Sequence, residues 1–187
     1  MKKMKSCIKV RRRVSILVSL IVVSIATLIP AYADGYSIGG KGPAGGIVYY
    51  LDESGGGLEA APVDQRIAEW SCYGTTISGA GETAVGTGQQ NTAAILASEC
   101  SSESAAEVAS NYMGPDGTTG GWFLPSKDEL NQLYLNNSVV GGFVDEFYWS
   151  SSESGNFNAW YQYFFDGLQN NYYLKYNSFR VRAVRAF

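Results

Sequence analysis

The stretch from Trp122 to Tyr134 reads WFLPSKDELNQLY and carries the clearest local signal in the chain. Ser126 is followed three residues later by Glu129, which is the spacing of a capping box at the start of a helix. One helical face then carries Leu130, Leu133 and Tyr134. The stretch therefore predicts a short amphipathic helix, and capping rather than catalysis accounts for Glu129.

The residues before this helix predict one strand and one or two helical pieces. Ile47 to Leu51 is β-branched and aromatic, and turn residues follow at 52–57. Residues 91–113 are rich in Ala, Leu, Ile and Val, which indicates one or two helical pieces interrupted at Ser101-Ser102. The glycine-rich residues 39–46 precede a strand, whereas the glycines of a nucleotide fingerprint follow one, so we expect no nucleotide there.

The composition changes sharply towards the C-terminus. The last 45 residues, from Phe143, hold 15 of the 25 aromatic residues of the chain. The segments 148–152, 159–165 and 179–185 have the β-branched and aromatic character of strands. This region is therefore expected to consist of strands and turns.

The N-terminus has the pattern of a secretory signal peptide. Seven Lys and Arg residues precede an apolar run at residues 14–29, and Ala31-Tyr32-Ala33 supplies the small residues of a cleavage site. We therefore expect a signal peptide at 1–33, a single ligand-binding domain at 34–187, and no stable membrane span after cleavage. An uncleaved anchor is the alternative. The protein is expected to be secreted or at the cell surface, and residence in the periplasm stays open.

Cleavage would change the charge of the chain. The remaining part has 7 basic and 17 acidic residues, a net charge of about −10, which disfavours nucleic acid as a partner. It also keeps two cysteines, Cys72 and Cys100. An oxidising compartment favours a disulfide between them, and two free buried thiols are the alternative.

The sequence lacks the commonest general base and metal ligand. The chain has no His, which excludes a Ser-His-Asp or Cys-His arrangement. Two cysteines cannot complete a tetrahedral zinc site, and no EF-hand loop is present. We therefore expect no enzyme activity, no cofactor, no catalytic residue and no metal ligand, while calcium dependence stays open.

Five segments in order resemble a known family: WFLPS at 122–126, EL at 129–130, YWSSSE at 148–153, AW at 159–160 and RVRAVR at 180–185. Together they are similar to the C-type-lectin-like domain of the variable proteins of diversity-generating retroelements. They also resemble the C-terminal domain of bacterial collagen-like adhesins. The resemblance implies an α+β class and a C-type-lectin-like fold, in which a small twisted antiparallel sheet has two flanking helices.

In that family the C-terminal strands and loops present the ligand-binding face, so the resemblance implies a variable region at residues 154–179. In the retroelement members, adenines of a template repeat are randomised, and AAC or AAT codons become any codon ending in a pyrimidine. Four residues of this region lack such a codon and are interpreted as a fixed framework: Trp160, Gln162, Gln169 and Lys175.

The residues predicted to contact the ligand are all encodable by a codon ending in a pyrimidine. They are Asn156, Phe157, Asn158, Tyr161, Tyr163, Phe165, Asp166, Leu168, Asn170, Asn171, Tyr172, Tyr173, Leu174, Tyr176, Asn177 and Phe179. Tyr offers a large contact area at low entropy cost, and Asn adds adaptable hydrogen bonding. The mixture is typical of a binding surface.

Strand alternation gives a first estimate of which side chains face outward. Over residues 159–165 it places Trp160, Gln162 and Phe164 on an inner face. The outer face would carry Tyr161, Tyr163 and Phe165. The alternative is an ordinary strand pair with a large aromatic core, since aromatic residues are common in strands.

The sequence thus favours a secreted or surface ligand-binding protein, diversified by a retroelement, whose aromatic and Asn-rich face binds an external protein or glycan. The identity of this partner and the oligomeric state are not encoded in the pattern. The alternative function is an envelope-associated adhesin that binds polysaccharide through fixed residues.

Overall fold

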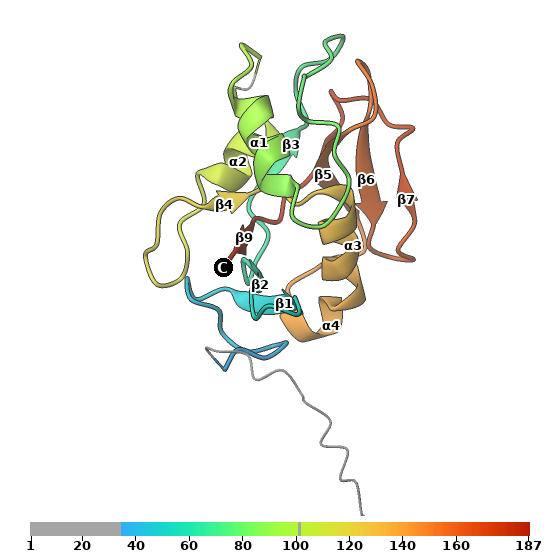
Figure 1. The fold of residues 1–187 in the computed structure, drawn as a ribbon. Coiled ribbons are helices and arrows are strands. Elements are labelled where there is room, and N and C mark those ends of the chain that lie inside the picture. The colour runs from blue at the N-terminus through green and yellow to red at the C-terminus, as the bar shows by residue number, and fades with distance from the viewer. Residues whose placement is uncertain (1–34, 101) are drawn as a thin grey trace, which may run out of the picture.

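The computed structural model describes residues 35–100 and 102–187 (Figure 1). The predicted signal peptide and its cleavage site lie outside the described residues. Within those residues, the helices are all too short or too polar to cross a membrane. The described chain combines helices with two β-sheets, and the predicted α+β class is confirmed.

The first sheet joins the two ends of the described chain. Its strands are β1 (Ile47–Leu51), β2 (Gly57–Ala60), β9 (Val184–Ala186) and β4 (Trp122–Phe123), in that order. All of its pairings are antiparallel. The predicted strand 47–51 is confirmed, and the turn after it leads directly into β2.

The second sheet contains most of the aromatic C-terminal region. Its order is β3-β8-β5-β6-β7, with bounds β3 Ile67–Glu69, β8 Ser178–Arg180, β5 Phe147–Glu153, β6 Ala159–Tyr163 and β7 Gln169–Asn170. Strands β5 and β8 pair in parallel, whereas the other neighbours are antiparallel. The expected strand 179–185 is wrong as a single element, because the chain leaves the second sheet after β8 and enters the first as β9.

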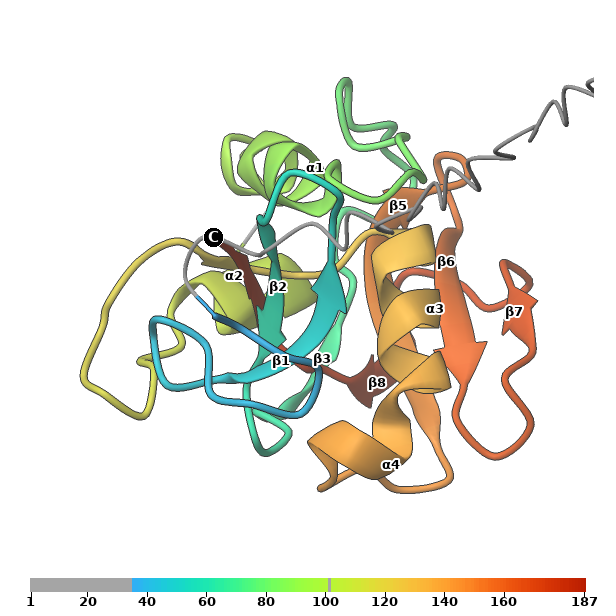
Figure 2. The ribbon, with the colours of Figure 1, turned by 60° about the horizontal axis from the view of Figure 1, so that its bottom comes forward.

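Four helices flank the sheets in the described part of the chain (Figure 2). They are α1 (Gly88–Leu96), α2 (Ala105–Ser110), α3 (Lys127–Leu135) and the single turn α4 (Asn137–Val140). The helical region expected at 91–113 is indeed two helices. Ser126 caps α3 by accepting the Glu129 amide, and the Glu129 side chain accepts the Ser126 amide at 2.7 Å, so the predicted capping box is confirmed.

Strand β5 supplies side chains to both hydrophobic cores. Successive side chains of a strand point to opposite faces, and Tyr148 and Trp149 accordingly enter different buried clusters. The Trp149 indole donates to the carbonyl of Ala68 at 3.1 Å, and the Trp70 indole donates to that of Ser150 at 2.9 Å. Both indole donors are therefore satisfied inside the core, as burial requires.

The glycine-rich loop at residues 39–46 closes around a carboxylate of the chain itself. The fully buried Glu59 accepts the amides of Ala44 at 3.1 Å and Gly46 at 2.8 Å, and Arg185 donates to it at 3.1 Å. A Cβ atom on Gly42 would lie 2.5 Å from this carboxylate. Close approach to Glu59 explains Gly42 and Gly46.

Cys72 and Cys100 form the expected disulfide, with a Cα–Cα distance of 5.2 Å. Cys72 follows β3, and Cys100 lies between α1 and α2. The bond therefore ties the edge of the second sheet to the helical layer.

Replacement of both Cys72 and Cys100 by Ser is expected to lower the free energy of unfolding by about 2–4 kcal/mol, because it frees a loop of the unfolded chain. Urea denaturation followed by tryptophan fluorescence measures this loss. The unmutated protein in excess dithiothreitol is the matched control and should lose a similar amount. A midpoint that neither treatment moves would contradict the stabilising role.

Candidate ligand-binding face

The segment 154–179 forms β6, β7, the start of β8 and the loops between them, and its strand β7 is one edge of the second sheet (Figure 1). Several of its large apolar side chains are exposed. Their exposed fractions are Tyr172 80%, Phe165 67%, Leu168 57%, Tyr176 50%, Phe157 43% and Tyr173 42%. These side chains therefore form an exposed apolar patch on segment 154–179.

The polar residues of the segment shape its loops as well as its surface. The Asn158 side chain donates to the carbonyls of Tyr172 and Tyr173 at 3.2 and 3.1 Å. The Asn177 side chain accepts the Leu174 amide at 3.0 Å, and that of Asp166 accepts an amide two residues on. Asn156 is exposed, whereas Asn170 and Asn171 are half-buried.

Tyr161 differs from its expected position on the outer face. Its side chain is only 5% exposed, and its ring packs within 5.2 Å of Tyr173 and 5.3 Å of Phe179, centroid to centroid. Burial raises the pKa of its hydroxyl. For this residue the aromatic-core alternative is correct, because the 171–179 segment covers that side of β6.

The other residues of the expected outer and inner faces lie as follows. Tyr163 is half-buried and Phe165 is exposed, while Phe164 on the inner side is buried. Gln162 is fully buried and donates to the Asn131 side chain and to the Gly167 carbonyl, both at 3.0 Å.

Two further framework residues contact the N-terminal end of α3. The Gln169 side chain donates to the Lys127 carbonyl at 2.6 Å. The Lys127 ammonium lies 5.6 Å from the ring centroid of the half-buried Trp160. The interpreted framework of β6 and β7 is therefore in contact with α3.

Tyr73 was not among the predicted site residues, yet it joins two of them. Its ring centroid lies 5.1 Å from that of Phe157 and 5.0 Å from that of Tyr176, and Tyr73 is 49% exposed. We call Tyr73, Phe157 and Tyr176 the aromatic ridge. No local sequence signal marks Tyr73, because it belongs to a loop rich in Gly, Ser and Thr.

A buried ion pair links the loops that carry the ridge residues. The Lys175 ammonium contacts the Glu153 carboxylate at 2.5 Å, and their side chains are 0% and 4% exposed. Lys175 also donates to the Thr75 carbonyl at 2.8 Å and lies 4.6 Å from the Trp70 ring centroid. Burial lowers the pKa of Lys175, and the nearby carboxylate opposes that shift.

The same pair fixes the loop that carries Tyr73. The Glu153 carboxylate accepts the Ile77 amide at 2.9 Å as well as the hydrogen bond from Lys175. Gly74 donates its amide to the Asn156 carbonyl at 2.8 Å, which joins the loop directly to the predicted variable region. Tyr73 is therefore held beside the other two rings of the ridge by the backbone as well as by ring contacts.

The described residues hold no cluster of three or more His, Cys, Asp or Glu side chains suited to a metal ion. Glu129, the carboxylate that most resembled a catalytic acid, is fully buried and accepts the amides of Ser126 at 2.7 Å and Gly86 at 2.8 Å. Burial raises the pKa of Glu129. Its position fits a helix cap that also holds the loop before α1.

The sheets and flanking helices define an α+β domain with an exposed aromatic face. No protein-family model matches the chain, and no curated protein matches it. Among solved structures, it is similar to a fimbrial protein from Bacteroides ovatus ATCC 8483, with a TM-score of 0.51 and 18% identity over 70% of this chain. The match covers 36% of that protein. At this identity the likeness shows the fold alone.

The Lys175→Met variant is expected to lose about 3–5 kcal/mol of unfolding free energy, because it leaves the Glu153 carboxylate buried without its cation. Adding Glu153→Gln should recover part of this loss, since no uncompensated charge then remains. Urea denaturation of both variants measures the effect. Lys41→Met, at an exposed position, is the control and should change stability by less than about 0.5 kcal/mol. Equal stability of Lys175→Met and the control would contradict the anchoring role.

Proposed function

We propose that this protein is a secreted or cell-surface binding protein, without enzyme activity, whose segment 154–179 contacts an external protein or glycan. The observation that carries the proposal is the set of exposed aromatic side chains on loops that a buried ion pair holds together. Exposed rings on a fixed support lose little entropy when a partner binds. The ridge residue Tyr73 extends this face beyond the predicted region.

The proposed class of fold is C-type-lectin-like. The pairing of β2 with β9 supports it, because this pairing brings the two ends of the described chain together and leaves the 154–179 segment in the other sheet. The name of the similar solved structure, a fimbrial protein, supports a role at the cell surface. We therefore propose that the protein is a surface adhesin.

We also propose that a retroelement diversifies the segment. The support is a partial contrast. Gln162 and Lys175 of the interpreted framework are fully buried, and Trp160 and Gln169 are half-buried, while Tyr172 and Phe165 are largely exposed; Tyr161, which is buried, is the exception. Exchange of exposed side chains usually costs little stability. Sequencing of the flanking DNA tests this point. A near-copy of the segment's coding DNA, with adenines at the proposed variable codons and beside a reverse transcriptase gene, is the expected result.

One observation favours the alternative, a polysaccharide-binding adhesin that uses fixed residues. Trp160 is half-buried beside Lys127, on the side of β6 that contacts α3. An aromatic ring next to a cation is a suitable contact for a sugar ring. In this alternative, binding depends on Trp160 and is insensitive to exchange of the exposed residues of segment 154–179.

The binding test uses an immobilised panel of extracellular matrix proteins, glycosaminoglycans and peptidoglycan fragments. For any probe that binds, Phe157→Ala, Tyr172→Ala and Tyr176→Ala should each weaken affinity by roughly tenfold, because aromatic anchors contribute more than about 1 kcal/mol. Surface plasmon resonance measures the dissociation constants. Met113→Ala removes a similarly exposed apolar side chain from another part of the surface and is the matched control.

Circular dichroism of each variant should show the unmutated fold, so that lost binding reports lost contacts. Unchanged affinity in all three folded variants would refute the proposed face. Affinity that falls only for Trp160→Ala would support the fixed-residue alternative.

A further inference from the structure

The three rings of the aromatic ridge form one exposed row. Tyr73 lies in the middle, with its ring tilted by 45° to that of Phe157 and by 55° to that of Tyr176. Each of the three side chains is between 43% and 50% exposed, so the rings meet solvent as well as one another. Figure 1 shows that the chain after β3 and the β5–β6 loop, which carry Tyr73 and Phe157, project from the same end of the domain. A partner that approaches this end meets three π systems side by side.

The backbone just before Tyr73 has an unusual conformation. Ser71 and Cys72 are consecutive non-glycine residues with left-handed backbones, with φ of 78° and 57°. Such conformations are unfavourable for L side chains and persist where the surroundings impose them. Here the surroundings include the disulfide to Cys100 and the Lys175 carbonyl, which accepts the Ser71 amide at 3.3 Å. The fold therefore holds the backbone that presents the Tyr73 ring to solvent.

The part of the chain that contains the ridge has few cations. Residues 67–126 include six acidic residues and no Lys or Arg. Residues 127–179 include six more acidic residues and two Lys, namely Lys127 and Lys175, and both of these ammonium groups are ion-paired. An excess of carboxylates attracts a cationic partner and repels an anionic one.

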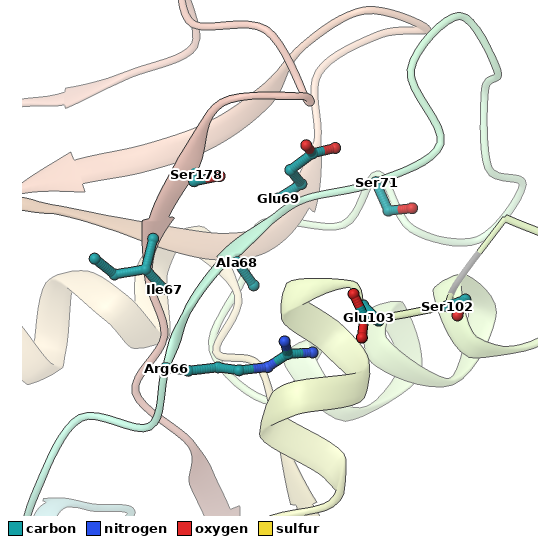
Figure 3. Close-up of a pocket in the computed structure, with 8 residues that line it drawn as sticks. All are labelled: Arg66, Ile67, Ala68, Glu69, Ser71, Ser102, Glu103 and Ser178. Atoms are coloured by element: carbon teal, nitrogen blue, oxygen red, sulfur yellow. The ribbon is translucent and has the colours of Figure 1, made fainter.

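Glu69 places one of these carboxylates close to the ridge. It is exposed and lies opposite Ser178 in the pairing of β3 with β8, two residues along the chain from Tyr176. Figure 3 shows Glu69 and Ser178 side by side, at the end of β3 that leads to Ser71. Arg66 lies at the other end of this strand in the same view. The end of β3 nearest the ridge is therefore acidic.

Glu99 is a second exposed carboxylate near the ridge. It precedes Cys100, whose disulfide partner Cys72 precedes Tyr73. The Cα atoms of the two cysteines are 5.2 Å apart, so Glu99 and Tyr73 belong to neighbouring chain segments. An incoming cation would meet a carboxylate on each of two segments next to the rings.

We infer that the aromatic ridge binds a basic segment of an external protein, with an Arg side chain placed over the rings. A guanidinium stacks on aromatic faces and is more weakly hydrated than an ammonium group. The carboxylates around the ridge increase the local concentration of such a partner. The inference rests on the proposed function and narrows its partner to a cationic protein segment rather than an anionic glycan.

The test is a nitrogen-15 NMR titration with a blocked peptide of alternating Arg and Gly, and with the same peptide carrying neutral citrulline in place of Arg. The Arg peptide should bind with a dissociation constant of roughly 0.1–1 mM, and the citrulline peptide about fivefold more weakly. The shifted amides should be those of residues 73–76, 156–158 and 175–177. Tyr73→Leu, which removes the π face, should weaken binding of the Arg peptide roughly threefold, whereas Tyr73→Phe should preserve it.

The carboxylates have a test of their own. The double variant Glu69→Gln and Glu99→Gln should weaken binding of the Arg peptide roughly twofold at low salt, and added NaCl should reduce this difference because salt screens exposed charges. Glu53→Gln, in the exposed turn between β1 and β2, is the matched control and should leave the affinity unchanged. Circular dichroism of each variant should show the unmutated fold.

Equal binding of the two peptides, or binding of neither, would overturn the inference. Equal affinities of Tyr73→Leu and Tyr73→Phe for the Arg peptide would also overturn it, as would shifts confined to residues away from the ridge. The panel of extracellular probes tests the proposed function separately. A panel probe that Phe157→Ala weakens, together with equal binding of the two peptides, would refute the cationic partner and leave the proposed binding face standing.

Discussion

The buried ion pair between Lys175 and Glu153 holds together the loops that carry the exposed aromatic residues. A charge removed from water needs a partner and hydrogen bonds at the place where it is buried. Here three segments meet: the end of β5, the 171–177 loop, and the chain after β3, which supplies the Trp70 ring and the Thr75 carbonyl. The ion pair acts together with the backbone here, because the Trp70 amide donates to the Lys175 carbonyl at 2.9 Å.

The same principle recurs elsewhere in the fold. Glu59 holds the loop at 39–46, and Glu129 holds the loop before α1. Arg182, also buried, pairs with Asp64 and donates to the carbonyls of residues 61, 141 and 142. Backbone amides and carbonyls that no strand satisfies are thus paired with buried charges. Long loops become ordered parts of the domain in this way.

Sequence reasoning predicted the features that depend on neighbouring residues. The capping box at Ser126 and the strand at 47–51 follow from local spacing and composition, and the structure has them. One or two helical pieces were expected at 91–113, and the structure has two helices there. The Cys72–Cys100 bond followed from the number of cysteines and the expected compartment. The division of 179–185 between two sheets was missed, because a β-branched run does not reveal which sheet each residue joins.

The site depends on contacts between distant segments, and these were harder to predict. Alternation assigns Tyr161 to one face of β6, but it does not show that the 171–179 segment covers that face. The loop that carries Tyr73 is held by Glu153 and Lys175, which lie 22 residues apart in the sequence. The Lys175–Glu153 pair is buried, whereas Phe157 and Tyr176 are exposed. Exchange of these exposed rings is therefore expected to leave the ion pair between their loops in place.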